Sequence, residues 1–271
     1  MTADRPPARW FSGAEAEPIG LGCSGARVWA LSDRAGRTVR YLKAERVEDA
    51  APAVPGYGSV VGEAERARWV RSQGLPAPAV LDAGVDGGWQ VMLSAAVPGI
   101  PMSALAGPAA SSAVSGLAEM LASMHHLPTD RCPFRRDLDV LLDGAAAAVA
   151  VGAVRADDFD EQRSGSTPAA LLALARRDRP AAEDLVVCHG DACLPNVLVD
   201  PESGRVTGLV DLGRLGIADR HSDLALAVRS LGDPQLNPGY GAAAAAEFLR
   251  RYPMRADPRL LDYYQLLDEF F

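Results

Sequence analysis

The amino-acid sequence predicts an α+β protein of two lobes, with a β-rich N-terminal lobe over residues 1–97 and a mostly helical C-terminal lobe over residues 98–271. Two observations predict this class. Residues 17–96 contain short β-prone segments between turn residues and one segment with helical spacing of apolar residues. From residue 111 onward, apolar residues recur mainly at helical spacing. A chain of 271 residues is long enough for two packed lobes with buried cores.

The N-terminal lobe is predicted to be a sheet that carries one helix. Its strands are expected where apolar and β-branched residues lie between turn residues, at 17–20, 28–31, 38–42, 79–85 and 89–96. A glycine-rich loop over residues 20–25 precedes the second of these strands. The helix is expected over residues 62–74, because Glu63, Ala67 and Val70 are spaced to share one face.

The C-terminal lobe is predicted to be mainly helical, with a loop and a hairpin in its middle. Helices are expected at 111–127, 137–154, 168–177 and from 221 to the end. The loop and the hairpin fall within residues 185–214, with a turn at 201–204. His125 and His126 end the first helix on different faces, which favours a core or cap role over a shared metal ion.

Composition and charge exclude several classes of protein. Hydrophobic residues make up 48% of the chain and charged residues 23%, as in ordinary globular proteins. The net charge of −8 disfavours a nucleic-acid partner and is compatible with a cationic substrate. No apolar run is long enough for a membrane helix, and the first ten residues, MTADRPPARW, lack an apolar signal stretch. We therefore expect a cytoplasmic protein without a membrane partner.

The four cysteines are predicted to be reduced thiols, because none forms a CxxC pair and a chain of this length needs no disulfide framework. Cys188, His189 and Cys193 are potential zinc ligands, but their spacing matches no common zinc module. We expect no zinc site there.

The first candidate site combines the glycine-rich loop with the single lysine of the chain. Lys43 stands among 26 arginines, and an ammonium group cannot be exchanged for a guanidinium where it must contact one buried anion. The loop GLGCSG fits GxGxxG, which alone also suits a dinucleotide site or a plain β-turn. Because strands follow this loop, a hairpin over nucleotide phosphates is favoured, with Lys43 reaching the phosphates and Glu63 pairing with it.

The second candidate site is the segment HGDACLPN, which has the pattern H-x-D-x4-N. Asp191 at its centre can orient and deprotonate an acceptor hydroxyl group. Asn196 supplies a neutral oxygen ligand for Mg²⁺, and Asp211 in the later Asp-Leu-Gly supplies a carboxylate. The ordered set of these motifs predicts phosphoryl transfer, which needs all of these charges to converge.

The segments HGDACLPN, LVDLGRLGIADRHSDLALA and YYQLLDEFF, with CPF at 132–134, resemble the aminoglycoside 3′-phosphotransferase family over most of the chain. The resemblance implies a two-lobed protein-kinase-like fold. It also implies ATP and Mg²⁺ as cofactors, and transfer of the γ-phosphate to the 3′-hydroxyl of antibiotics such as kanamycin and neomycin. This reaction inactivates the drug and gives resistance.

The resemblance also implies roles for individual residues. Asp191 is similar to the catalytic aspartate, and Asn196 and Asp211 to the magnesium ligands. Nucleotide-binding positions are matched by Ser24, Lys43, Glu63, Ser94, Ala95 and Ala96. Positions that contact the drug are matched by Asp160, Glu161, Arg214, Asp233, Glu269 and Phe271, the last through its main-chain carboxylate. The last five residues, 267–271, form an apolar and acidic C-terminal segment. We expect the rings of Phe270 and Phe271 to pack this segment against the helical lobe.

Three residues depart from the pattern of the family. Leu194 and Ser230 stand where some members have an acidic residue, which leaves the drug range open. Ala95 replaces a polar linker residue, with little effect expected because the linker is read through its backbone. Two alternative functions remain: a kinase of another small hydroxyl compound, such as choline, homoserine or a macrolide, and a non-catalytic nucleotide-binding module.

Overall fold

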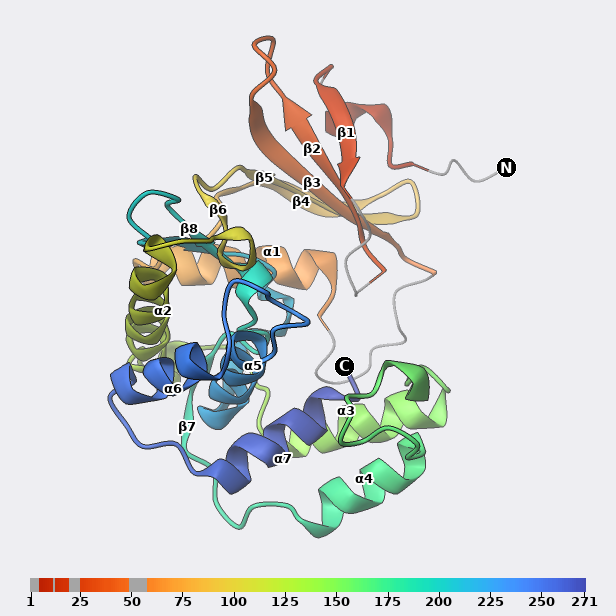
Figure 1. Cartoon of the computed structure of the whole chain (residues 1–271). Coiled ribbons are helices and arrows are strands. Elements are labelled where there is room, and N and C mark those ends of the chain that lie inside the picture. The colour runs from red at the N-terminus through yellow and green to blue at the C-terminus, as the bar shows by residue number, and fades with distance from the viewer. Residues whose placement is uncertain (1–4, 12, 20–24, 49–57) are drawn as a thin grey trace. The chain divides into compact units, whose positions relative to one another are not determined.

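The computed structural model describes residues 5–11, 13–19, 25–48 and 58–271 (Figure 1). Their contacts divide the chain into two compact units. The N-terminal unit contains the described residues up to Pro98, together with Gly208–Gly213 from much later in the chain. The C-terminal unit contains Gly99–Thr207 and Arg214–Phe271.

The N-terminal unit is a five-stranded antiparallel sheet in the order β1-β2-β3-β5-β4 (Figure 1). Its strands are β1 (Glu15–Ile19), β2 (Arg27–Ser32), β3 (Thr38–Arg46), β4 (Val80–Asp86) and β5 (Trp89–Ala95). The helix α1 (Val60–Ser72) begins at Ser59, whose hydroxyl accepts a hydrogen bond from the Gly62 amide at 3.1 Å. The predicted strands and helix are all present, and β3 continues four residues beyond its expected end.

Alternation along β3 determines which side chains face α1. Leu42 and Ala44 are fully buried in an aromatic core on one face of the sheet, with Trp10, Phe11, Trp29 and Trp89. Lys43, between them in sequence, must therefore point to the opposite face. On that face α1 packs through Val60 and Ala64 against Met92 of β5.

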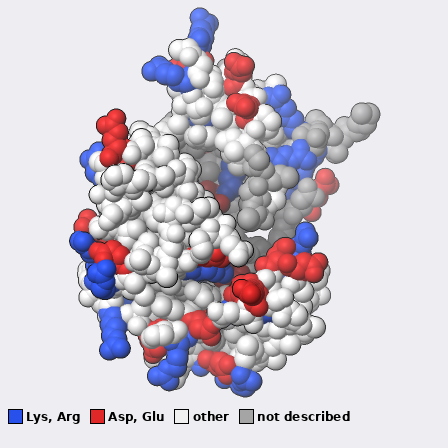
Figure 2. Space-filling model, in the orientation of Figure 1, with Lys and Arg blue, Asp and Glu red and all other residues white. Residues whose placement is uncertain are grey.

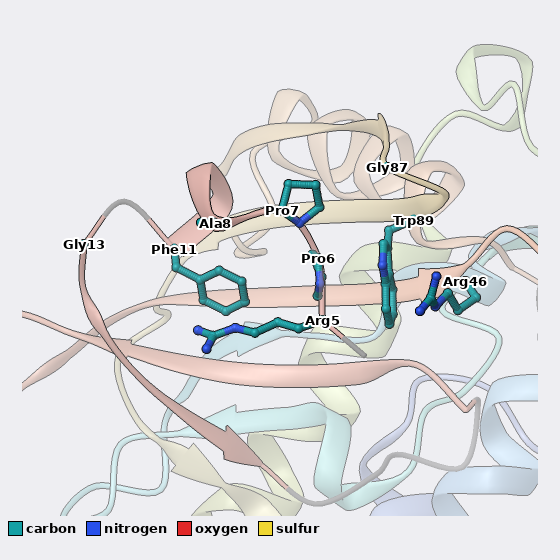
Figure 3. Close-up of a pocket in the computed structure, with 9 residues that line it drawn as sticks. All are labelled: Arg5, Pro6, Pro7, Ala8, Phe11, Gly13, Arg46, Gly87 and Trp89. Carbon is teal, nitrogen blue, oxygen red and sulfur yellow. The ribbon is translucent and has the colours of Figure 1, made fainter. Parts of the chain in front are cut away.

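Figure 3 shows a pocket beside the aromatic core, and its volume is about 690 Å³. Part of its lining comes from the N-terminal segment, through Arg5, Pro6, Pro7, Ala8, Phe11 and Gly13. The guanidinium of Arg5 lies 3.8 Å from the centre of the Phe11 ring, and that of Arg46 lies 4.3 Å from the centre of the Trp89 ring. Both rings are buried, so these cation–π contacts cover them. The pocket contains none of the predicted site residues. One of its residues, Phe11, makes an edge-to-face ring contact with Trp29 of β2 and so packs the N-terminal segment against the sheet.

The C-terminal unit is mainly helical, as predicted. Its helices are α2 (Ala109–His125), α3 (Leu138–Ala150), α4 (Pro168–Arg177), α5 (His221–Gly232), α6 (Ala242–Arg251) and α7 (Pro258–Asp268). Asp137, Thr167 and Asp257 cap the N-termini of α3, α4 and α7 with their side chains. No helix of the described residues combines the length and the apolar character needed to cross a bilayer.

Short strands complete this unit and present the loop of the second candidate site. The strand β7 (Leu185–Cys188) pairs with β10 (Gly216–Asp219), and β6 (Ile100–Pro101) pairs with β8 (Val197–Val199). A further strand, β9 (Val206–Leu209), follows the predicted turn. Sequence analysis missed β10, whose four residues contain too little alternation to predict a strand.

Charged side chains of both signs lie on the face of the described residues that Figure 2 shows. Figure 2 shows acidic and basic groups interspersed on the visible part of the described residues, with no broad basic area there.

Candidate functional site

Lys43 lies at the centre of a cluster in the N-terminal unit. Its Nζ donates to Glu63 Oε2 at 2.7 Å and to Asp211 Oδ1 at 2.8 Å. The side chains of Lys43 and Glu63 are 14% and 8% exposed, whereas that of Asp211 is 42% exposed. The ammonium group is thus shared by one buried and one accessible carboxylate.

The local fold accounts for this arrangement. Alternation in β3 turns Lys43 toward α1, and Glu63 lies in the first turn of that helix, where the helix dipole favours a negative charge. Burial alone would lower the pKa of Lys43, but the charges of Glu63 and Asp211 outweigh it and raise this pKa above its usual value. Lys43 therefore remains charged at neutral pH.

Asp211 has an unusual backbone conformation. Its φ is 56°, and it is the single non-glycine residue of the described ranges with a positive φ. This left-handed conformation is costly for a residue with a Cβ, and such strain is found most often at functional sites. Nearby, the backbones of Gly58 and Gly213 touch so closely that a Cβ at Gly58 would clash with the Gly213 carbonyl.

Asp191 and Asn196 are joined within the loop that follows β7. Nδ2 of Asn196 donates to Asp191 Oδ2 at 2.9 Å and to the Asp191 carbonyl at 3.1 Å. The short 3-10 turn Leu194–Asn196 brings the two side chains together. Because the amide nitrogen faces Asp191, the carbonyl oxygen Oδ1 of Asn196 is directed away from it and can serve as a ligand.

A buried carboxylate, that of Asp223 in α5, holds this loop through two backbone amides. The amides of His189 and Gly190 donate to its Oδ2 and Oδ1 at 2.7 and 2.8 Å. Although burial raises the pKa of Asp223, its hydrogen bond from His125 and nearby charges lower it below the usual value. Gly190 has φ 82°, and a Cβ there would clash with the Arg214 carbonyl, so this position requires glycine.

Two further side chains bear on the loop: Ser230, which supports it from α5, and Cys193, which lies in it beside Asp191. Ser230 is buried, and its hydroxyl accepts from the Leu194 amide at 3.0 Å and from Asn237 Nδ2 at 3.0 Å. This residue therefore supports the loop from within the protein. Burial and the charge of Asp191 raise the pKa of the Cys193 thiol, so Cys193 remains protonated beside Asp191.

The C-terminal segment is docked on the helical unit. Phe270 is 1% exposed, as expected, and the guanidinium groups of Arg136 and Arg214 lie 5.3 and 5.8 Å from the centre of the Phe271 ring. Nη2 of Arg214 donates to the main-chain oxygen of Phe271, and its Nη1 to Asp268 Oδ1 at 3.0 Å. Arg214 thereby fixes the position of the segment.

Two predicted substrate-binding acids lie next to each other in the same unit. The Asp160 amide donates to Glu269 Oε2 at 3.3 Å, and Asp160 Oδ2 is paired with Arg163 at 2.5 Å. Burial and the adjacent charge of Asp160 raise the pKa of Glu269 to about 7. Glu161 is exposed nearby.

The remaining predicted positions are placed as follows. Asp233 caps a turn after α5, where its side chain accepts from the Gln235 amide at 2.7 Å, and no contact joins it to Glu269. Ser94 and Ala95 end β5, and the Ala96 amide donates to the Val39 carbonyl at 2.9 Å. Ser24 and the loop over residues 20–24 lie outside the described residues.

Residues 15–261 match the model of the phosphotransferase enzyme family, which is most of the chain. The chain belongs to this family. An aminoglycoside 3′-phosphotransferase of Streptomyces fradiae is 46% identical over 213 residues, which is 78% of this chain and 79% of the relative. The family resemblance predicted from the sequence is confirmed.

Solved structures agree with this assignment. A crystal structure of an aminoglycoside 3′-phosphotransferase of type VIII superposes with a TM-score of 0.85 and 42% identity, over 96% of this chain and 94% of the other. The aminoglycoside phosphotransferase APH(3'')-Id of Streptomyces rimosus, in complex with ADP and streptomycin, has a TM-score of 0.77 and 31% identity, over 95% and 92% of the two chains. The predicted α+β class with a kinase-like fold is confirmed.

In this phosphotransferase, the sequence predicted no role for Asp223 or Asp268 and only a core or cap role for His125, although all three side chains form hydrogen bonds within the C-terminal unit. The signal for Asp223 was its place in the segment HSDLALA, where an acidic residue stands in the first turn of a helix, directly before an apolar run. His125, Cys188 and Asp223 place three possible metal ligands within 4.8 Å of one another. Hydrogen bonds already engage both nitrogens of His125, both oxygens of Asp223 and the Cys188 thiol, so the cluster is explained without a metal.

Proposed function

We propose that this phosphotransferase transfers the γ-phosphate of ATP to the 3′-hydroxyl of an aminoglycoside antibiotic of the kanamycin or neomycin type, and so inactivates it. The observation that carries the proposal is the Asp191 carboxylate, whose Oδ2 accepts from Asn196 at 2.9 Å in a loop whose His189 and Gly190 amides donate to Asp223. The Streptomyces fradiae relative and the type VIII structure, both named as 3′-phosphotransferases, support this acceptor.

Asp191 is the proposed general base. With Oδ2 engaged by Asn196, Oδ1 is the oxygen that accepts the proton of the drug hydroxyl as it attacks the phosphorus atom. The protonated Cys193 thiol adds no competing negative charge beside it. Removal of such a base lowers turnover about 10²–10⁴-fold.

Lys43 is the proposed ligand of the nucleotide phosphates. Glu63 holds its ammonium at 2.7 Å and keeps it charged, which is the form that neutralises phosphate oxygens. Ser24 in the glycine-rich loop is proposed to lie near the phosphates, and the backbone of residues 94–96 to bind adenine. The Streptomyces rimosus relative, solved with ADP, supports ATP as the donor.

Asn196 and Asp211 are the proposed Mg²⁺ ligands, and their chemistry fits that ion. An amide oxygen and a carboxylate are hard oxygen donors, which Mg²⁺ prefers. The strained φ of 56° at Asp211 is the kind of backbone that a ligand-binding role retains. When bound, Mg²⁺ bridges phosphate oxygens and neutralises their charge.

The drug is proposed to bind through acidic groups of the C-terminal unit. Asp160, Glu161, Asp233 and Glu269 offer carboxylates to the ammonium groups of an aminoglycoside. Arg214 bears the same charge as the drug, so its proposed contribution is to hold the main-chain oxygen of Phe271 in place for the drug. Burial and the charge of Asp160 raise the pKa of Glu269, so an ammonium group of the drug beside it would favour its charged form.

The proposal is tested by ATP turnover with a panel of acceptors. Kanamycin and neomycin should support turnover, and a 3′-deoxy analogue of kanamycin should bind and inhibit without being phosphorylated. Streptomycin, choline, homoserine and a macrolide test the alternative acceptors. Turnover with choline or a macrolide in place of kanamycin would contradict the proposal, and turnover with none would favour a nucleotide-binding module.

A further inference from the structure

A chain of hydrogen bonds runs through the C-terminal unit from its surface to the Asp191 loop. It begins at the ion pair of Arg220 with Asp184, where Nε lies 2.5 Å from Oδ2. Nη1 of Arg220 also donates to the hydroxyl of Tyr252 at 3.1 Å. That hydroxyl lies 2.7 Å from His125 Nδ1, and His125 Nε2 lies 3.1 Å from Asp223 Oδ2.

Both nitrogens of His125 are engaged along this chain. The Tyr252 oxygen accepts from Arg220, which has only donors, and the same hydroxyl is the hydrogen-bond partner of His125 Nδ1. The carboxylate of Asp223 accepts from Nε2 on the other side of the ring. Tyr252 therefore holds His125 in the ring orientation that places Nε2 against Asp223.

This chain of hydrogen bonds ends at the two residues that precede Asp191. Oδ2 of Asp223, which accepts from His125, also accepts from the His189 amide at 2.7 Å, and Oδ1 of Asp223 accepts from the Gly190 amide at 2.8 Å. The side chains of His125 and Asp223 are fully buried, so no water can replace a lost partner without reorganisation. The orientation of Asp223 is thus set on one side by His125 and on the other by the loop.

We propose that Tyr252 is a positioning residue for phosphoryl transfer, which acts through His125 and Asp223 on the orientation of the Asp191 loop. The catalytic consequence rests on the proposed function, since it assigns Asp191 as the base. Removing the hydroxyl of Tyr252 leaves Nδ1 of His125 buried without its hydrogen-bond partner, so the imidazole is no longer held in place and gains by turning toward another partner. A turn of the ring weakens the hydrogen bond from Nε2 to Asp223.

The chain offers a matched control in Tyr263. Tyr252 and Tyr263 are 4% and 5% exposed, and each makes a ring contact with an aromatic neighbour. The Tyr263 hydroxyl donates to the Ala175 carbonyl at 2.9 Å, at the end of α4 and outside the Asp223 network. Tyr252→Phe and Tyr263→Phe thus each delete one buried hydroxyl, and only the first deletes one that acts on the loop.

The experiment measures hydrogen–deuterium exchange of the loop amides in the full chain, together with steady-state kinetics with ATP and kanamycin. We expect Tyr252→Phe to accelerate exchange of the His189 and Gly190 amides and to lower kcat about tenfold or more, with both KM values nearly unchanged. Tyr263→Phe should leave exchange and kcat as in the wild type at a similar loss of thermal stability. Arg220→Gln, which removes the donor to Tyr252, should act in the same direction as Tyr252→Phe.

Two results would overturn the positioning role. One is wild-type exchange of the loop amides in folded Tyr252→Phe, and the other is an equal change in both tyrosine variants. If Tyr252→Phe does not fold, Arg220→Gln decides by the same two readouts. Failure of the wild-type enzyme to phosphorylate kanamycin would contradict the proposed acceptor, while the exchange measurement would still decide whether Tyr252 orders the loop.

Discussion

Replacing Lys43 by methionine removes the ammonium group and keeps most of the side-chain volume. In the structure this leaves Glu63, whose side chain is 8% exposed, without the cation 2.7 Å from its Oε2. Asp211 also loses its partner, but its side chain is 42% exposed and water can solvate it. The cost of Lys43→Met is therefore dominated by Glu63.

The size of this cost follows from burial and distance. Unit charges at the observed 2.7 Å attract by about 6 kcal/mol at an effective dielectric constant of about 20, and desolvation of both groups offsets much of this. Removing one partner of a buried pair costs about 3–5 kcal/mol, and we expect about 3 kcal/mol here because Glu63 is not completely buried. For a protein of this size that lowers Tm by about 6–12 °C.

Thermal unfolding at neutral pH measures this cost, with Arg37→Met as the matched control. Arg37 and Asp33 form a 2.9 Å ion pair in the turn between β2 and β3, but the arginine side chain is 79% exposed, so its loss should change Tm far less than the loss of Lys43. The double variant Lys43→Met/Glu63→Leu should recover most of the stability and none of the ATP affinity. An unchanged Tm in Lys43→Met, or restored ATP binding in the double variant, would refute the reasoning.

Three further predictions concern the C-terminal unit. Asp191→Asn should lower kcat about 10²–10⁴-fold and leave the KM for ATP nearly unchanged, and near-normal kcat would contradict its role as base. Because the pKa of Glu269 is raised to about 7, its negative charge is lost as the pH falls through that value. The KM for kanamycin should therefore rise as the pH is lowered from about 8 to about 6. Glu269→Gln should have a high KM that does not depend on pH in this range. A wild-type KM in that variant would exclude Glu269 from the drug site. Phe270→Ala should cost about 3–5 kcal/mol in chemical unfolding and raise the KM for kanamycin, because the ring is 1% exposed and docks the C-terminal segment; a loss below about 1 kcal/mol would show that it does not.

Local patterns in the sequence were sufficient to predict most of the fold. The segments 79–85 and 89–96, predicted as strands, form the hairpin of β4 and β5, and Gly87 and Gly88 between them adopt the positive φ that only glycine accepts readily. The order of the glycine-rich loop, Lys43 and the helix that carries Glu63 predicted the pairing of Lys43 with Glu63, and the structure places their charged atoms 2.7 Å apart. The catalytic and binding roles of these residues remain predictions.

The network beneath the Asp191 loop could not be predicted, because it depends on packing between distant segments. His125 is 127 residues from Tyr252 and 98 residues from Asp223 along the chain. Periodicity indicated only that His125 lies in the core or at a cap, which its burial confirms. Likewise Ser230 is interpreted from the sequence as a residue affecting the drug range, whereas its hydroxyl binds the loop amide of Leu194.

The position of the phosphate on the product tests the central claim most directly. Kanamycin that has been incubated with the wild-type enzyme, ATP and Mg²⁺ is purified and examined by phosphorus–proton correlation NMR. The account predicts one phosphorus signal, coupled to the proton on the 3′ carbon, and its loss with Asp191→Asn over the same incubation. A phosphate on another carbon, or an equal yield of product with Asp191→Asn, would contradict the account.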